Sequence, residues 1–149
     1  MTTDGRLRSY QPADRPALVA LWSRCGLTRP WNDPDRDIDR KLAHDDHGLL
    51  VLEHRTGLIG SVMVGYEGHR GWINYLAVDP DHQGRGWGRV LMEAAERHLR
   101  DLGCPKVNLQ VRTENPAAVE FYRRIGYTVD DVVSMGRRLQ DDRPDPFSG

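Results

Sequence analysis

The chain has 149 residues, a formal net charge of −1 and 38% hydrophobic residues. This length and balance suit one globular domain with a single core, and they exclude a fibrous or a disordered chain. The even balance of acids and bases also argues against a nucleic acid as partner, because the arginines are scattered and form no recognisable basic face.

The cysteines and the N-terminus bear on the compartment. Cys25 and Cys104 lie far apart with no second pair, which favours free or buried thiols in a reducing environment over a disulfide framework or a zinc site. The first residues, "MTTDGR", form no apolar leader, and no run reaches membrane-spanning length. We therefore expect a cytoplasmic protein that needs neither a metal nor a membrane.

The N-terminal third predicts one short strand and two helices. The strand is expected at residues 6–10, and the helix that follows spans 16–26, with Pro16 suited to its first turn and Gly26 as its stop. After a polar loop, a second helix begins at about Pro34 and turns apolar side chains inward.

The pattern then changes to strands. The runs at 48–54 and 57–68 are apolar and separated by a tight turn, so we expect an antiparallel pair. A further strand lies within 70–80 and is closed by Asp79 and Pro80. Several strands therefore meet in the middle of the chain.

The last part alternates helices and strands. Apolar residues at helical spacing over 90–99 predict a helix packed on a sheet, followed by a strand at 106–111 and a short helix at 115–126. Residues 127–139 predict one or two last strands. The whole, residues 1–140, is expected to be one α/β domain with a mixed sheet, and 141–149 a solvated tail.

The stretch "HQGRGWG", residues 82–88, places Gly84, Gly86 and Gly88 on alternate positions before a helix. Each glycine costs about 0.5–1 kcal/mol relative to alanine in regular structure, so the backbone must need the freedom. A strand, a glycine-rich turn and a helix N-terminus together form an anion site, which the neighbouring Arg85 and Arg89 would reinforce. The alternative is that the glycines serve only close packing of the helix.

Neither common nucleotide motif fits this loop. A P-loop needs Gly-Lys followed by Ser or Thr, which is missing here, and the dinucleotide fingerprint would place Arg89 or Leu91 at its last glycine.

What does fit is the pattern Q/R-x-x-G-x-G/A, met by Gln83, Gly86 and Gly88 after "LAVDP". A second block, "NPAAVEFYRRIGY" at 115–127, is similar to N-x-x-A-x-x-F-Y-x-x-x-G-Y/F. With these two blocks in this order, the chain resembles the GNAT superfamily of N-acetyltransferases over nearly its whole length. The segments "RPWNDPDRDIDRK" and "GYEGHRG" further resemble a small bacterial branch, the YpeA-like proteins.

The resemblance implies a mixed, largely antiparallel sheet with helices on both faces. It also implies transfer of an acetyl group from acetyl-coenzyme A to a primary amine, by direct attack through a tetrahedral intermediate. A backbone N–H near Val78 would be the oxyanion donor, an effect worth about 2.7–4 kcal/mol per donor. The backbone segment that would face the acetyl group and the pantetheine arm comprises Leu76, Ala77 and Val78. The segment that would hold the pyrophosphate comprises Gln83, Gly84, Arg85, Gly86, Trp87, Gly88 and Arg89.

The second block carries the remaining cofactor contacts. By resemblance, Asn115 and Ala118 would contact the cofactor arm, and Tyr122 would contact it and protonate the leaving thiolate as general acid. Asn115 is equally readable as an ordinary helix N-cap, and an aromatic pair such as Phe121 and Tyr122 is often part of a core.

The general base is harder to assign. Several family members use a glutamate in the strand before the glycine loop, but "WINYLAV" has no carboxylate and Trp72 stands near that place. Either Glu67 or His69 in the preceding turn could act through water, with Asn74 positioning the water. A solvated turn is the plainer interpretation of both Glu67 and His69.

The acceptor site is expected between the first helices and the last strands. There Trp31 would be an apolar platform, and Asp33 or Asp35 would attract a cationic amine. The alternative is a polar loop in which Trp31 plugs the core. A small-molecule or peptide amine remains open as the acceptor, and the chain is expected to be a monomer or a homodimer.

A second class of function also fits the resemblance. A non-catalytic acyl-coenzyme A sensor or interaction module would keep the fold and lose turnover, which the missing glutamate favours and Tyr122 opposes. A nucleic-acid-binding module is a distant third possibility.

Overall fold

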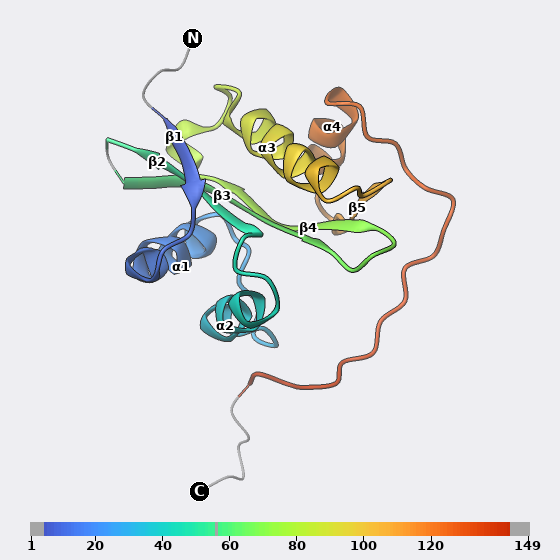
Figure 1. Cartoon of the computed structure of the whole chain (residues 1–149), viewed down its shortest axis with the longest axis horizontal. Coiled ribbons are helices and arrows are strands. Elements are labelled where there is room, and N and C mark those ends of the chain that lie inside the picture. Colours follow the sequence, from blue (N-terminus) through green and yellow to red (C-terminus); the bar gives the residue numbers. More distant parts are fainter. Residues whose placement is uncertain (1–4, 56, 144–149) are drawn as a thin grey trace, which may run out of the picture.

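One sheet of five strands organises the chain (Figure 1). The computed structural model describes residues 5–55 and 57–143, and its strands follow the order β1-β2-β3-β4-β5. The first four pair antiparallel and β5 pairs parallel to β4, which confirms the predicted mixed, largely antiparallel sheet. The strands are β1 (Arg6–Ser9), β2 (Leu49–His54), β3 (Gly57–Tyr66), β4 (Gly71–Val78) and β5 (Val107–Leu109).

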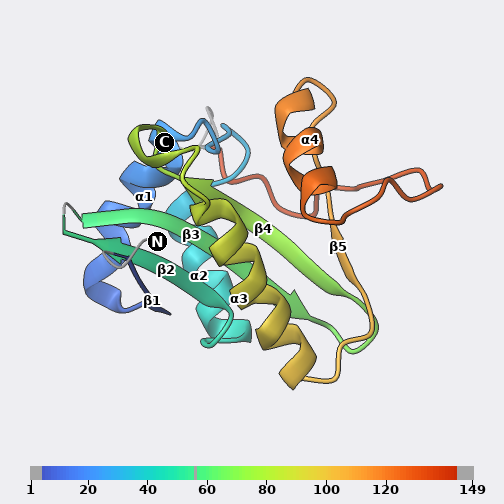
Figure 2. The ribbon, with the colours of Figure 1, turned by 90° about the horizontal axis from the view of Figure 1, so that it is seen from above.

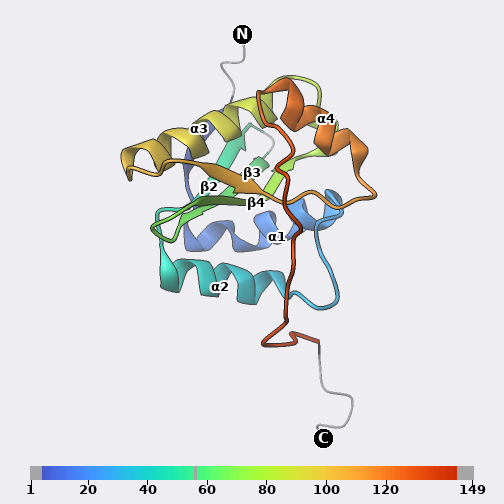
Figure 3. The same ribbon diagram turned by 90° about the vertical axis from the view of Figure 1, so that its right-hand side faces the viewer.

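Helices cover both faces of the sheet, as expected. Figures 1 and 3 show α1 and α2 on one face and α3 and α4 on the other. Two short 3-10 turns precede α1 and α3. The helices are α1 (Arg15–Arg24), α2 (Pro34–His44), α3 (Trp87–Asp101) and α4 (Pro116–Arg124), and the turns are η1 (Pro12–Asp14) and η2 (Pro80–His82).

Each face of the sheet has its own apolar core. On the α3 face, Leu91, Met92 and Leu99 are almost completely buried against β3 and β4. On the α1 face, Leu18 and Trp22 pack with residues of α2 and of the strands. No described helix is both long enough and apolar enough to cross a membrane.

The predicted last strands are absent from the described residues. After α4 the chain is extended but joins no sheet, and it crosses from the α4 face to the α2 face past β5 (Figures 2 and 3). Side chains connect it to the residues that flank β5: Lys106, directly before the strand, pairs with Asp130 at 2.7 Å, and Gln110, directly after it, donates to Ser134. Its apolar side chains are exposed by 72–91%: Val129, Val132, Val133, Met135 and Leu139. The strand prediction here was wrong, because it rested on apolar composition and these side chains find no core.

The end of this segment is held against α2. Asp142 accepts a hydrogen bond from the Asp33 N–H at 2.8 Å and pairs with Arg40 at 2.6 Å. Its side chain is only 1% exposed, although the solvated tail was predicted to begin at residue 141. We call residues 128–143 the C-terminal strap; residues 144–149 of the predicted tail lie outside the described part of the chain.

Candidate active site

The strands β4 and β5 are paired over a short length only. Gly71, Trp72 and Ile73 pair with the three residues of β5, and the rest of β4 has no partner in β5. Figure 2 shows the two strands running apart from this point, with α4 beside β5. The edge of β4 beyond Ile73 therefore presents backbone groups that the sheet leaves unused.

A bulge lies where the pairing ends. The register between β3 and β4 shifts here, and Tyr75 has a φ of +51°, the one positive φ of a non-glycine residue in the described chain. Such a conformation costs about 1–3 kcal/mol and is retained where the surroundings enforce it.

Buried side chains enforce this bulge. The indole N–H of Trp22 donates to the Ser61 hydroxyl at 2.9 Å, and that hydroxyl donates to the Tyr75 carbonyl at 2.8 Å. The ring of Trp22 also stacks on the ring of Tyr75, with centroids 3.8 Å apart. Trp22 and Ser61 are fully buried, so water does not compete for these bonds.

The bulge also carries a polar contact with α2. The Tyr75 hydroxyl donates to the Asp37 carboxylate at 2.5 Å. Burial, with Asp37 beside it, raises the pKa of Tyr75 far above its ordinary value, so the phenol stays neutral. None of Trp22, Asp37, Ser61 and Tyr75 was predicted as a site residue, because they come from four separate segments.

Beyond the bulge, the peptide of Val78 points away from β3. The next residue, Asp79, donates its N–H to the Ile59 carbonyl in β3 at 2.7 Å. Backbone groups alternate between the two edges of a strand, so the N–H of Val78 faces the edge that lacks a β5 partner. Its carbonyl accepts from the Gln83 side chain at 3.0 Å and from Cys25 at 3.3 Å. Val78 thus has the orientation that the predicted oxyanion donor needs.

The glycine loop lies directly after β4, and its three glycines have two different causes. Gly84 and Gly86 have φ of +78° and +87°, and a side chain added at either would meet nothing within 4 Å. Gly88 has no such φ, but a Cβ there would lie 3.0 Å from the ring of Phe121 in α4. The first two glycines therefore shape an open loop, and the third allows close packing, here of α4 on α3; anion binding by the loop stays a prediction.

The loop leaves the N-terminus of α3 without a side-chain cap. Gly86 is the N-cap residue and has no side chain to satisfy the first N–H groups of the helix. Gln83, Arg85 and Arg89 are exposed around it, and among the described residues Arg89 pairs only with Glu93, at 3.4 Å. An anion could bind these N–H groups from the solvent side.

Trp87 differs from the other predicted loop residues. Its side chain is 5% exposed and packs in the core on the α3 face, so only its backbone can face a ligand.

The second motif forms α4. Asn115 caps this helix by accepting from the Ala118 N–H at 3.2 Å, so the cap interpretation holds, and its cofactor contact stays a prediction. Tyr122 is half-buried and packs edge-on against Phe121 and Tyr127, with ring centroids 5.1 and 5.8 Å away. Burial raises the pKa of Tyr122 to about 12, so it keeps the proton that the predicted acid must donate.

A cavity of about 500 Å³ lies on the other face of the sheet, beside the bulge. Asn74 and Tyr75 line it from β4, and Arg112 lines it from just beyond β5. Its volume falls within the range of small-molecule sites. The remaining lining residues come from β3, α2 and the loop after α1: Leu27, Arg29, Asn32, Asp37, Arg40, Lys41, His44 and Met63.

Of the predicted acceptor residues, only Asn74 lines this cavity. Trp31 lies beside it, with the Arg112 guanidinium 5.6 Å from its ring centre, so the platform is already covered by a cation. Asp33 caps α2 through the Asp35 N–H at 2.9 Å. Asp35 pairs with Arg15 at 3.5 Å.

Glu67 and His69 lie in the exposed turn before β4, where Glu67 accepts from the Arg70 N–H. Neither residue lines the cavity, so the structure does not bring the predicted base to the acceptor site. The base role of Glu67 stays a prediction.

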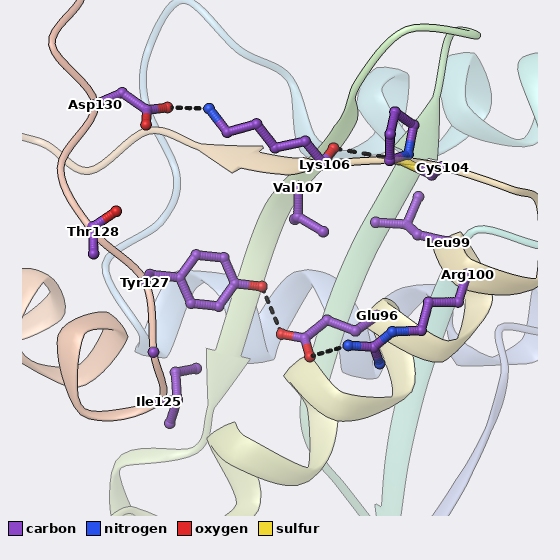
Figure 4. Close-up of a pocket in the computed structure, with 12 residues that line it drawn as sticks. Glu96, Leu99, Arg100, Cys104, Lys106, Val107, Ile125, Tyr127, Thr128 and Asp130 are labelled. Carbon is purple, nitrogen blue, oxygen red and sulfur yellow. Dashed lines mark hydrogen bonds and ion pairs between the residues drawn. The ribbon is translucent and has the colours of Figure 1, made fainter.

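A second cavity, of about 400 Å³, lies at the start of β5 (Figure 4). Four of its polar side chains already pair with one another: Tyr127 donates to Glu96 at 2.7 Å, and Lys106 pairs with Asp130 at 2.7 Å. It contains neither the bulge nor the glycine loop, so we do not place the chemistry there. No group of three or more possible metal ligands occurs in the described chain.

Comparison with known proteins agrees with this arrangement. Among solved structures, Ard1 from Thermoplasma volcanium superposes with a TM-score of 0.77 at 22% identity, covering 86% of this chain and 85% of its own. N-acetylglutamate synthase from Neisseria gonorrhoeae, complexed with coenzyme A and L-arginine, gives 0.63 at 21% identity, covering 80% and 27%. At these identities the likeness shows the fold alone.

Relatives found by sequence are more similar to this chain than these solved structures. An acetyltransferase of Pectobacterium atrosepticum is 45% identical over 137 residues, covering 92% of this chain and 97% of its own. An uncharacterized N-acetyltransferase of Yersinia pestis is 44% identical over 133 residues, covering 89% and 94%. Residues 15–127 match the model of the acetyltransferase (GNAT) family. Both predicted motifs lie within this match, and the chain belongs to the GNAT family of acetyltransferases.

Proposed function

We propose that this acetyltransferase uses acetyl-coenzyme A and transfers the acetyl group to the amine of a small molecule. The observation that carries the proposal is the free edge of β4, which runs from the bulge at Tyr75 to the glycine loop. One end of this edge meets an uncapped helix N-terminus, and the other meets the cavity that Asn74 lines.

The residues around the loop fit the proposed co-substrate. The open N–H groups at Gly84–Gly88 suit a pyrophosphate, and the exposed Arg85 and Arg89 add positive charge. The Neisseria relative in fold was solved with coenzyme A, which supports this choice of ligand. Bound acetyl-coenzyme A would supply an acetyl thioester, whose carbonyl carbon is open to attack by a neutral amine.

Three groups of the chain would then act on that reaction. Asp37, the one acid that lines the cavity, attracts the ammonium form of the acceptor, which loses its proton to solvent before attack. The Val78 N–H donates to the negative charge that develops on the acetyl oxygen as the nitrogen–carbon bond forms. As the carbon–sulfur bond breaks, Tyr122 gives its proton to the thiolate, the nitrogen of the new amide releases its extra proton to solvent, and Tyr122 takes a proton back from solvent.

The two tyrosines lie on opposite faces of the sheet. Tyr122 packs with the α3-side core and Tyr75 with the α1-side core. A thioester arm that enters from the α3 face and an amine that enters from the α1 face would therefore meet where β4 and β5 separate. This arrangement keeps the acid close to the thiol and away from the amine.

Calorimetry followed by a turnover assay tests the proposal. We expect acetyl-coenzyme A to bind at submillimolar concentration and to raise the melting temperature, because its site forms only in the folded chain. Thiol release should then accompany the disappearance of an amine. No binding at millimolar acetyl-coenzyme A would refute the proposal, and binding without thiol release for any amine would favour the sensor module.

A further inference from the structure

The acceptor cavity concentrates positive charge in a chain whose net charge is −1. Four of its lining side chains are cations, Arg29, Arg40, Lys41 and Arg112, against the single acid Asp37. An acceptor whose charged groups are all positive would be repelled by most of the charged side chains of this cavity.

Two of these cations are already engaged within the chain. Arg40 pairs with Asp142 at 2.6 Å and with Asp37 at 3.3 Å. Lys41 is buried, its ammonium donates to the Val64 carbonyl at 2.6 Å, and Asp45 lies 3.6 Å away. Neither has much capacity left for a ligand.

The other two are different. Arg112 stacks on Trp31 and makes no ion pair with any described carboxylate. Stacking uses the face of a guanidinium and leaves the N–H groups along its edge free to donate. Arg29 donates from one nitrogen to the carbonyls of Gly26 at 2.8 Å and Thr28 at 2.9 Å, and it too has no carboxylate partner in the described chain.

Several contacts hold these two arginines in place. The carbonyls of the α1–α2 loop fix Arg29, and the ring of Trp31 supports Arg112. Trp31 is in turn held by Arg138 of the C-terminal strap, which donates to its carbonyl at 3.1 Å. Two fixed guanidiniums without counter-ions in one cavity form a site for a carboxylate or a phosphate.

We propose that the acceptor carries an anionic group, a carboxylate or a phosphate, in addition to the amine that is acetylated. Arg112 and Arg29 bind the anion, while Asp37 and Asn74 face the amine beside the bulge. The proposal rests on the proposed function and narrows its substrate class to small anionic amines, since the cavity holds about 500 Å³. It adds an anionic group to the expectation that Asp33 or Asp35 would attract a cationic amine.

Matched pairs of amines test this proposal by direct binding. Butylamine and 4-aminobutyrate differ by a carboxylate, and ethanolamine and phosphoethanolamine differ by a phosphate. Calorimetry on the whole protein, with and without saturating coenzyme A, should show at least one anion-bearing amine bound tenfold or more tightly than its partner without the anionic group. The two pairs show which anion the site prefers.

Variants at Arg112 then test whether this side chain causes the preference for the anionic amine. Arg112→Met should abolish it, and Arg112→Lys should restore only part, because a lysine lacks the planar fork. Arg97→Met is the matched control, because Arg97 is exposed on α3, outside the cavity lining. Circular dichroism melts would show that each variant is folded.

The outcomes separate this proposal from the proposed function. Equal binding within both pairs, no binding of either anionic amine, or a preference that survives Arg112→Met would overturn the anionic site even if acetyl-coenzyme A binds. Failure of acetyl-coenzyme A to bind would refute the proposed function, while the preference for anionic amines would still be measured in the free protein.

Discussion

One end of the proposed site is formed by backbone groups and the other by side chains. At the glycine loop the chain uses backbone: two glycines with positive φ and a helix N-terminus that no side chain caps. At the bulge it uses side chains: Trp22 and Ser61 fix the Tyr75 peptide through buried hydrogen bonds. A backbone site suits a constant ligand such as a pyrophosphate, whereas a side-chain site can change its ligand through single substitutions.

This difference predicts that a substitution at one end will impair only the ligand that binds there. Changes at the loop should weaken acetyl-coenzyme A binding and leave the acceptor site intact. Changes at the bulge or around the cavity should alter the acceptor's kinetics with little effect on acetyl-coenzyme A. The predictions below test this separation.

The largest effect is expected for Gly86→Val. A β-branched residue at a φ of +87° costs about 1–3 kcal/mol, so the loop must either stay strained or move its N–H groups. We expect the Kd for acetyl-coenzyme A to rise by about 10–100-fold, measured by calorimetry, with an unchanged circular dichroism spectrum. Gly136→Val is the matched control, because Gly136 also has open surroundings but no positive φ. Equal affinity of Gly86→Val and the parent would contradict the loop assignment.

Tyr122→Phe tests the acid at the junction of the two ends. The ring keeps its packing, so acetyl-coenzyme A binding should persist while kcat falls about tenfold or more, the usual range for a positioned acid. Because the pKa of Tyr122 is about 12, the parent should keep this proton up to about pH 10 and show no loss of kcat from its ionisation.

Tyr127→Phe provides the control for that experiment. Tyr127 belongs to the same aromatic cluster, but its hydroxyl donates to Glu96 at 2.7 Å. Its loss should cost about 1 kcal/mol of unfolding free energy and leave kcat unchanged. If both variants keep the parent kcat while chemistry is rate-limiting, Tyr122 is only a packing residue.

The comparison also explains what could be predicted from sequence. The glycine loop and the capped helix at Asn115 are local patterns, so spacing alone located them, together with the order of helices and the mixed sheet. The bulge could not be predicted, because its hydrogen bonds join Trp22 and Ser61, which are 39 residues apart. Asp33 was read as a substrate contact, but a carboxylate before Pro34 is as well explained by helix capping.

The failure at residues 127–139 has a related physical cause. Apolar composition predicts a strand only if a neighbouring strand offers a free edge and a core that covers the side chains. Here the side chains of Asp130 and Ser134 contact residues that flank β5, and Val133 and Met135 remain exposed by 86% and 91%. The spacing of apolar residues in the sequence does not show whether another element will cover their side chains.

A smaller effect is expected for Ser61→Ala, which removes the link between Trp22 and the bulge. The indole N–H and the Tyr75 carbonyl would lose their partner in a site buried from solvent, at a cost of about 1–3 kcal/mol in unfolding free energy. Denaturant unfolding would measure this loss, with the exposed Ser23→Ala as control. The acceptor kcat/KM should fall several-fold with acetyl-coenzyme A affinity unchanged; a parallel loss of both would contradict the separation of the two ends.

The smallest effect concerns Asp142→Asn, which loosens the C-terminal strap beside the acceptor cavity. The Arg40 guanidinium, with the Asp33 N–H, holds the pKa of Asp142 well below its usual range. Because this pKa is depressed in the folded chain, the carboxylate stabilises the fold above the unfolded pKa, and this contribution is lost as pH falls through the folded pKa. The melting temperature of the parent should therefore exceed that of the variant at neutral pH, and the gap should begin to narrow below about pH 4 and shrink further as the pH falls.

The same substitution weakens one of the two ion pairs of Arg40 at the edge of the cavity and leaves its pair with Asp37, so the acceptor KM should change by a few-fold while the Kd for acetyl-coenzyme A stays constant. Asp141→Asn is the matched control, since Asp141 pairs with Arg143 within the strap and not with α2. If the strap does not support the acceptor wall, the two variants will have the same KM as the parent. A change in acetyl-coenzyme A affinity would instead mean that the strap acts on the glycine-loop end, and the division between a backbone site and a side-chain site would no longer hold.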